Sequence, residues 1–114
     1  MKYVIHEEEL EWGLHTALEG AEMTTFFTKK DQGAQATIGM VKIPKGKELD
    51  WHDHGESDDI LHILQGKAKM EMDGIGDFDM KKGSHVLVPA HVRHRIHEVS
   101  EDLTLYHIKA PATI

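Results

Sequence analysis

Short runs of strand-forming residues, separated at close intervals by turn residues, constrain this chain more than any other feature. Residues 67–72 alternate polar and apolar side chains with a period of two, which is typical of a strand with one buried face. We therefore expect Ala68, Met70 and Met72 to face the core. No stretch carries apolar residues at the three-and-four spacing of a long helix. The pattern predicts an all-β barrel or sandwich.

The turn residues divide the chain into about nine expected strands. The expected strands are residues 23–28, 36–43, the segment of His52 and His54, 59–65, 67–72, a return strand from 78, 86–89, 92–99 and 103–108. Turns are expected between them, including residues 30–33 and 100–102. We interpret residues 1–114 as one domain, with an N-terminal arm or strand at 1–22 and the barrel at 23–110.

Charge and composition exclude several classes of protein. The formal net charge is -7, which argues against nucleic acid or an anionic membrane as a partner. The chain has no cysteine, so a disulfide, a thiolate metal site and a thiol nucleophile are excluded. We expect a cytoplasmic protein, because no apolar run is long enough for a signal peptide core or a membrane span.

Histidine is the unusual residue, with ten in 114 positions. His52 and His54 are two apart, so in a strand both imidazoles lie on the same face. An acid-rich loop and an apolar run follow them. A second glycine-led segment ends at His94. Two such segments facing each other across a barrel would bring three imidazoles and a carboxylate together, and in a chain without cysteine these are the donors for a metal ion.

The first of these segments has a recognisable spacing of residues. It runs Gly46, His52, His54, Asp59 and Gly66. This resembles the first cupin motif, a glycine followed by His-x-His, an acidic residue and a second glycine, and every spacing is met.

The second segment resembles the partner motif of the same family. It runs Gly83, Pro89, His91, His94 and Glu98. His91 replaces the motif's second glycine, and Glu98 replaces its asparagine. The resemblance covers residues 39–108, so the chain is similar to a small single-domain cupin.

The resemblance implies a double-stranded β-helix, or jelly-roll barrel, with one divalent metal inside. The implied ligands are His52, His54, Asp59 and His94, a set that suits Fe, Mn, Ni, Cu or Zn. The family has glutamate where this chain has Asp59, which is shorter by one methylene, or about 1.5 Å. Asp59 either binds the metal directly or holds a metal-bound water. Asp58 is the competing acid, but choosing it breaks the spacing to Gly66.

The remaining histidines are placed by strand alternation. His62 and His97 are each three residues from an implied ligand, so we expect them to face away from the site. We expect His6 and His15 on the surface. Three other histidines could line either the barrel or its rim, and the pattern does not decide between the two: His85, His91 and His107.

Three further side chains have alternative interpretations. Trp51 is expected to face away from the site and pack under a neighbouring element or across a dimer contact. Arg93 and Arg95 are either solvated charges or an anchor for a substrate carboxylate. Met70, Met72 and Met80 are interpreted as core residues, not as a soft-metal site.

The cupin barrel carries many activities, so the fold does not fix the function. The first hypothesis is a metal-dependent enzyme acting on a small organic molecule, with dioxygenase or oxidative cleavage favoured and isomerase or lyase chemistry close behind. The alternative is a non-catalytic module that senses a metal or a small ligand. A storage barrel is disfavoured, because it needs no intact histidine set. We expect a homodimer paired through residues 23–28, since an open sheet leaves edges to cover.

Overall fold

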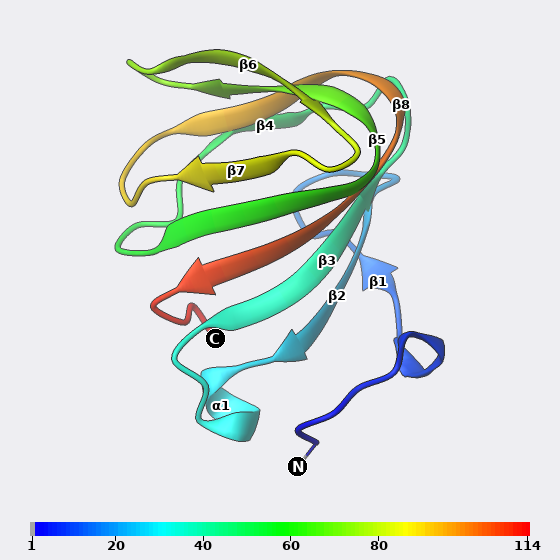
Figure 1. The fold of residues 1–114 in the computed structure, drawn as a ribbon, viewed down its shortest axis with the longest axis vertical. Coiled ribbons are helices and arrows are strands. Elements are labelled where there is room, and N and C mark those ends of the chain that lie inside the picture. The colour runs from blue at the N-terminus through cyan, green and yellow to red at the C-terminus, as the bar shows by residue number, and fades with distance from the viewer. Residues whose placement is uncertain (1) are drawn as a thin grey trace.

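The computed structural model describes residues 2–114 and consists mainly of antiparallel β-strands (Figure 1). The helical segments are short: η1 (Glu7–Glu9), a 3-10 helix, and α1 (Lys29–Gln32). The strands are β1 (Gly13–Leu14), β2 (Glu22–Phe27), β3 (Thr37–Ile43), β4 (Leu49–His52), β5 (Asp58–Met72), β6 (Gly76–Lys81), β7 (His85–Val88) and β8 (His94–Ala110). The predicted all-β class is confirmed.

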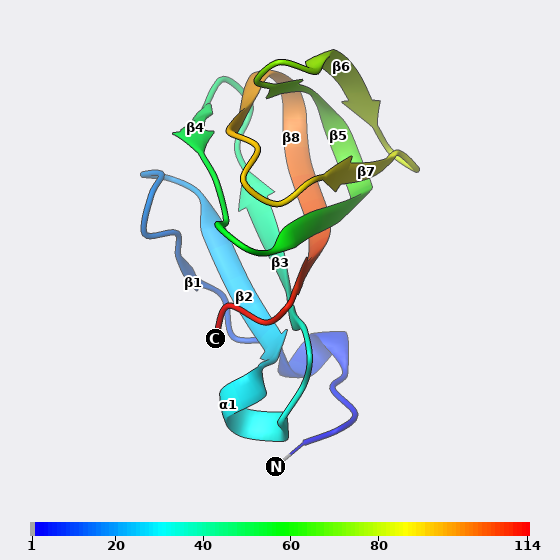
Figure 2. The same cartoon turned by 90° about the vertical axis from the view of Figure 1, so that its left-hand side faces the viewer.

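Two long strands, β5 and β8, form the centre of the sheet (Figures 1 and 2). They pair with each other from Asp58 opposite Ala110 to Met72 opposite His94. The sheet order is β1-β2-β3-β8-β5-β6, with β4 added to β8 and β7 added to β5. Each long strand therefore contributes to both halves of a jelly-roll barrel, which is the predicted architecture.

Residues 2–114 form eight strands where about nine were predicted, because two pairs of expected strands are each one strand and β1 lies in the expected arm. Residues 59–65 and 67–72 belong to the single strand β5, and residues 92–99 and 103–108 fall largely within the single strand β8. Residues 100–102 were expected to form a polar turn, but they are extended, because Glu101 pairs with Lys67 across the sheet. Register shifts on both sides of Gly66 bend β5 without ending it, and Gly66 has a φ of 96° that favours glycine.

The turn expected at residues 30–33 is a single turn of helix, α1. The Thr28 side chain accepts a hydrogen bond from the Asp31 N–H at 2.9 Å, and Gly33 ends the helix in the left-handed region. The capping residues Thr28 and Gly33 stabilise this helix. Its single turn is too short to show the helical spacing of apolar residues.

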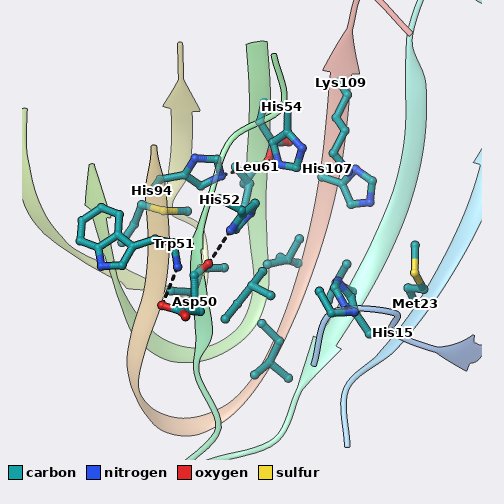
Figure 3. A pocket seen from close by; sticks show the side chains of 18 of the residues that line it. His15, Met23, Asp50, Trp51, His52, His54, Leu61, His94, His107 and Lys109 are labelled. Carbon is teal, nitrogen blue, oxygen red and sulfur yellow. Dashed lines mark hydrogen bonds and ion pairs between the residues drawn. The ribbon is translucent and has the colours of Figure 1, made fainter. Parts of the chain in front are cut away.

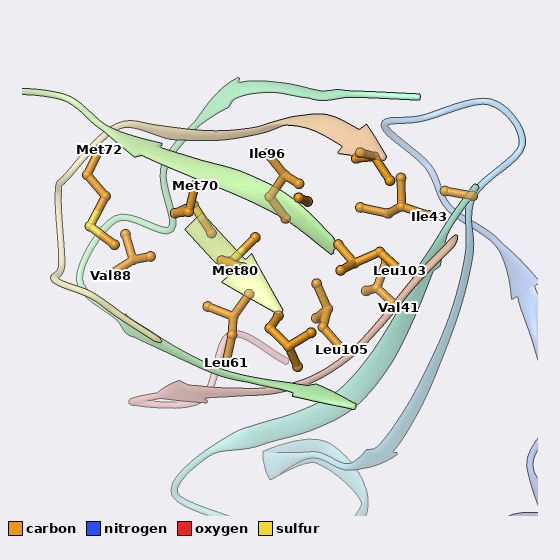
Figure 4. Close-up of a cluster of buried hydrophobic side chains, with 14 residues drawn as sticks. Val41, Ile43, Leu61, Met70, Met72, Met80, Val88, Ile96, Leu103 and Leu105 are labelled. Carbon is orange, nitrogen blue, oxygen red and sulfur yellow. The ribbon is translucent and has the colours of Figure 1, made fainter. Parts of the chain in front are cut away.

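The core fills the space between the two halves of the barrel (Figure 4). Ala68, Met70 and Met72 are 5%, 0% and 6% exposed, so the inward face predicted from alternation is confirmed. Met80 is buried with them. Several core side chains, including Leu61 and Leu105, also line the cavity that contains the histidines.

Candidate metal centre and its cavity

Three histidines from the two motifs meet inside the barrel. His52 ends β4, His94 begins β8, and the two residues are paired across the sheet. His54 lies two residues beyond the end of β4, in the loop before β5, and not on the strand as expected. The imidazole centroids are 4.2 Å (52–94), 5.0 Å (52–54) and 5.2 Å (54–94) apart. One ligand nitrogen from each ring lies within 4.8 Å of the others.

Backbone carbonyls orient two of these rings. His52 Nδ1 lies 2.7 Å from the carbonyl oxygen of Asp50, and His94 Nδ1 lies 2.9 Å from that of Val92. A carbonyl oxygen only accepts, so each Nδ1 carries the proton and each neutral ring keeps its lone pair on Nε2. Burial lowers the pKa of both histidines, which favours the neutral form. This arrangement is typical of histidines that bind a metal.

Asp59 lies beside the three rings but not among them. Its Oδ2 is 3.2 Å from His54 Nε2 and 4.0 Å from His94 Nε2. Among residues 2–114, the group of ligand atoms within 4.8 Å contains the three histidines and leaves Asp59 out, in keeping with its short side chain. Burial alone would raise the pKa of Asp59, but the hydrogen bond with His54 and the charge of Lys109 lower it. The carboxylate is therefore ionised next to the cluster.

The cluster lies on one side of a cavity of about 370 Å³ (Figure 3). Its walls are largely apolar, with side chains such as Val41 and Ile43. This size and lining are typical of sites for small organic ligands. Polar side chains from β8, His107 and Lys109, line the same cavity beside His54 (Figure 3).

His107, left undecided by the sequence, is inside the barrel and 4% exposed. Neither of its ring nitrogens has a hydrogen-bond partner. Burial and the charge of Lys109 lower its pKa to about 4, so the ring is neutral at neutral pH. A buried imidazole that no protein group bonds is costly, and a hydrogen bond to a ligand in the cavity would offset that cost.

His15 was expected on the surface, and that prediction is wrong. It is half-buried and lines the cavity from the loop after β1. Its Nδ1 accepts a hydrogen bond from the Ala17 N–H at 3.0 Å. The sequence around His15 has no motif, and only the path of the loop brings it to the cavity.

The other histidines lie outside the cavity. His6 is exposed, as expected. His62 faces away from Asp59, also as expected, and its Nδ1 is 3.1 Å from that of His85 on β7. His91 is exposed, and its Nε2 lies 3.3 Å from Glu56.

His97 faces away from the metal cluster, as expected, but it is buried in a second group of ligand-type residues with Glu71 and Asp77. His97 Nε2 is 2.8 Å from Asp77 Oδ1. Arg95 already neutralises Glu71, with its Nε and Nη2 each 2.8 Å from Oε1. This group is an ion-pair network on the sheet and not a vacant cation site.

Trp51 lies under the guanidinium groups of Arg93 and Arg95, which are 5.7 Å and 5.4 Å from its ring centroid. The sequence indicated this packing against a neighbouring element, but Trp51 also lines the cavity, so the expectation that it faces away from the site is not met. Arg95 is engaged by Trp51 and Glu71, and neither arginine lines the cavity. The cation inside the cavity is Lys109, which the sequence analysis did not single out.

An antiparallel barrel with a histidine cluster inside matches the resemblance to cupins in the sequence. Comparison with known proteins agrees with this assignment. Residues 39–109 match the family model described as a cupin domain, so the chain belongs to the cupin family. An uncharacterised protein of Methanocaldococcus jannaschii is 28% identical over 68 residues, which are 60% of this chain and 54% of that protein. The chain therefore spans about half the length of this relative.

Solved structures show the same fold at low identity. A protein of Thermotoga maritima, described as a predicted oxalate decarboxylase, superposes with a TM-score of 0.82 at 21% identity, covering 95% of this chain and 98% of that one. An RmlC-like cupin from Shewanella frigidimarina superposes with a TM-score of 0.82 at 18% identity, covering 99% and 94%. Among residues 2–114, no helix has the length and apolar character needed to cross a membrane.

Proposed function

We propose that this cupin binds one divalent transition metal through His52, His54 and His94 and acts as a metal-dependent enzyme on a small organic molecule. The hydrogen bonds from Nδ1 of His52 and His94 to backbone carbonyls carry this proposal, because they leave both Nε2 lone pairs free. Three imidazoles suit Fe, Mn, Ni, Cu or Zn. When bound, such an ion supplies a Lewis acid, and iron in particular can activate dioxygen.

Asp59 supplies a negative charge to the same centre. Its Oδ2 lies 3.2 Å from His54 Nε2, so it either completes the ligand set after a small shift or fixes the orientation of His54. The carboxylate is buried and ionised, and a cation bound to the histidines would balance its charge.

The cavity groups favour oxidative chemistry over isomerisation. An isomerase needs a general base with a pKa near the working pH. The pKa of Asp59 is lowered from its ordinary value, and that of His107 is lowered to about 4. Oxidative cleavage with dioxygen as the co-reactant is therefore the favoured reaction class, and isomerase or lyase chemistry is the alternative.

Oxygen consumption by the iron-loaded protein tests this reaction class. The panel consists of diketones, catechols and keto acids, and the control is the His52→Ala, His54→Ala double variant. We expect uptake of dioxygen with at least one compound and none in the variant. Binding of compounds without turnover would instead indicate the non-catalytic ligand-sensing module.

We also propose a homodimer that pairs through β2. In the described part of the chain, residues 2–114, β1 pairs with Glu22 and Met23 of β2, and the rest of this edge has no neighbouring strand within the sheet. Light scattering tests the pairing, and a monomer at working concentration contradicts it. A cytoplasmic location stays a prediction.

A further inference from the structure

His107 is a buried polar group that the metal proposal does not use. It projects from β8 into the cavity, and neither ring nitrogen has a partner. Its place depends on Gly39, the residue opposite it on β3: a Cβ at Gly39 would lie 3.1 Å from His107 Nε2. The small residue on β3 therefore leaves room for an imidazole whose hydrogen-bonding capacity is unused.

Lys109 extends the same wall. It is two residues after His107 on β8, so both side chains lie on the inner face of the strand (Figure 3). Its side chain is half-buried, and no ion pair or hydrogen bond holds its ammonium group among residues 2–114. Asp59 lies opposite Lys109 on β5 and its charge acts on the ammonium, but the two form no ion pair, so a ligand that brings an acceptor to hydrogen-bond distance would be bound strongly.

His15, which also lines the cavity, adds a third donor (Figure 3). Because its Nδ1 accepts the Ala17 N–H, the proton of the neutral ring is on Nε2, which is then a donor. Among residues 2–114, Asp59 is the buried carboxylate that lines this cavity; its Oδ2 faces His54, and its Oδ1 has no hydrogen-bond partner. The walls therefore offer three donor groups, on His15, His107 and Lys109, to a ligand that brings acceptors.

We propose that His107 and Lys109 recognise the carboxylate of a small organic acid whose other end reaches the cluster of His52, His54 and His94. This inference rests on the proposed function and names its substrate class. Lys109 supplies the charge, and His107 supplies a neutral N–H donor in a site shielded from water, where such bonds are strongest. A neutral ligand of the same shape would leave the Lys109 ammonium desolvated and unpaired.

Charge within the cavity agrees with an anionic ligand. Asp59 inside and the exposed Asp50 at the wall are the two carboxylates that line it, and Lys109 is the one lysine. With a divalent cation on the histidines, positive charge exceeds negative charge by one. A monocarboxylate would restore neutrality in a low-dielectric site.

Calorimetric titration with matched charged and neutral probes tests the inference. The probes are pyruvate against pyruvamide and benzoate against benzamide, each titrated into metal-free and zinc-loaded protein. The variants are Lys109→Met, which removes the charge, and Lys109→Arg, which keeps it. Lys81→Met is the matched control, because Lys81 is exposed on β6, outside the cavity.

We expect the protein to bind at least one carboxylate about tenfold or more tightly than its amide, as a charge-assisted pair requires. Lys109→Met should lose this preference, while Lys109→Arg and Lys81→Met keep it. Equal binding of acid and amide, no binding of either acid, or an unchanged preference in Lys109→Met overturns the inference.

Metal analysis of the same samples separates the two proposals. Stoichiometric metal without a Lys109-dependent preference overturns the carboxylate site and leaves the metal centre standing. A Lys109-dependent preference in protein that takes up no metal on loading supports the carboxylate site and contradicts the proposed function.

Discussion

His52 and His94 lie opposite each other on the paired strands β4 and β8, with ring centroids 4.2 Å apart. The two residues are 42 positions apart in the sequence, and backbone pairing brings them together. Backbone pairing therefore sets the spacing of these two rings, and they are held ready for one ion. A preorganised site of this kind binds metal without the cost of ordering its ligands.

Replacing Asp59 by asparagine tests the role of the acid. Asp59→Asn keeps the size of the side chain and removes the charge beside His54 and His94. We expect metal affinity to fall about 10- to 100-fold while the fold is retained. Competition with a chelator measures the affinity. The neighbouring Asp58→Asn is the control, since Asp58 is exposed, and equal affinity in the two variants would refute a role for Asp59.

Acid should destabilise the metal-free protein before its carboxylates titrate. The pKa of His107 is about 4 in the fold against 6.5 in the unfolded chain, so the unfolded state takes up the proton first as the pH falls. Stability is therefore lost between about pH 6.5 and 4, by up to about 3 kcal/mol from this residue. Burial also lowers the pKa values of His15, His52 and His94, which adds to the same trend.

Urea unfolding at pH 7 and pH 4.5 measures this loss. His107→Gln removes one titrating group, so its stability should fall less than that of the parent between the two pH values. An identical fall in both proteins would show that His107 does not titrate as its burial requires.

The bend in β5 depends on Gly66. A Cβ at this position would lie 2.2 Å from the carbonyl oxygen of Asp102, whereas a Cβ at Gly46 would meet nothing within 4 Å. Both glycines have positive φ, so Gly46→Ala controls for backbone strain alone. We expect Gly66→Ala to cost at least about 1 kcal/mol more than Gly46→Ala. Thermal unfolding of the pair measures the difference, and equal melting temperatures would contradict it.

The sequence predicted the fold class and the convergence of His52, His54 and His94 because both depend on spacing. Strand alternation and two glycine-led segments are local patterns. Strand ends were harder to predict: the polar residues at 100–102 resemble a turn, but pairing with β5 keeps them extended. Pairing between distant strands is not visible in a local window.

Two departures from the family motif also have a structural explanation. His91 replaces a glycine and has a φ of 66°, and Glu98 replaces an asparagine and has a φ of 47°. These are the two non-glycine residues with positive φ among residues 2–114. The backbone keeps the left-handed conformation that glycine and asparagine favour.

The part of the cavity wall formed by His15, His107 and Lys109 could not be predicted from the sequence. His107 and Lys109 belong to no motif, and their alternation in β8 gives a face only once the register with β3 and β5 is known. His15 reaches the cavity through a loop, where no periodicity applies.

Metal content is the most direct test of the account. Protein purified without a nickel column should carry stoichiometric transition metal by elemental analysis. The His52→Ala, His54→Ala variant should carry almost none, whereas His62→Ala, His85→Ala, which removes a histidine pair outside the cavity, should carry as much as the parent. Equal metal content in all three proteins, or no metal in the parent after loading, would contradict the metal centre.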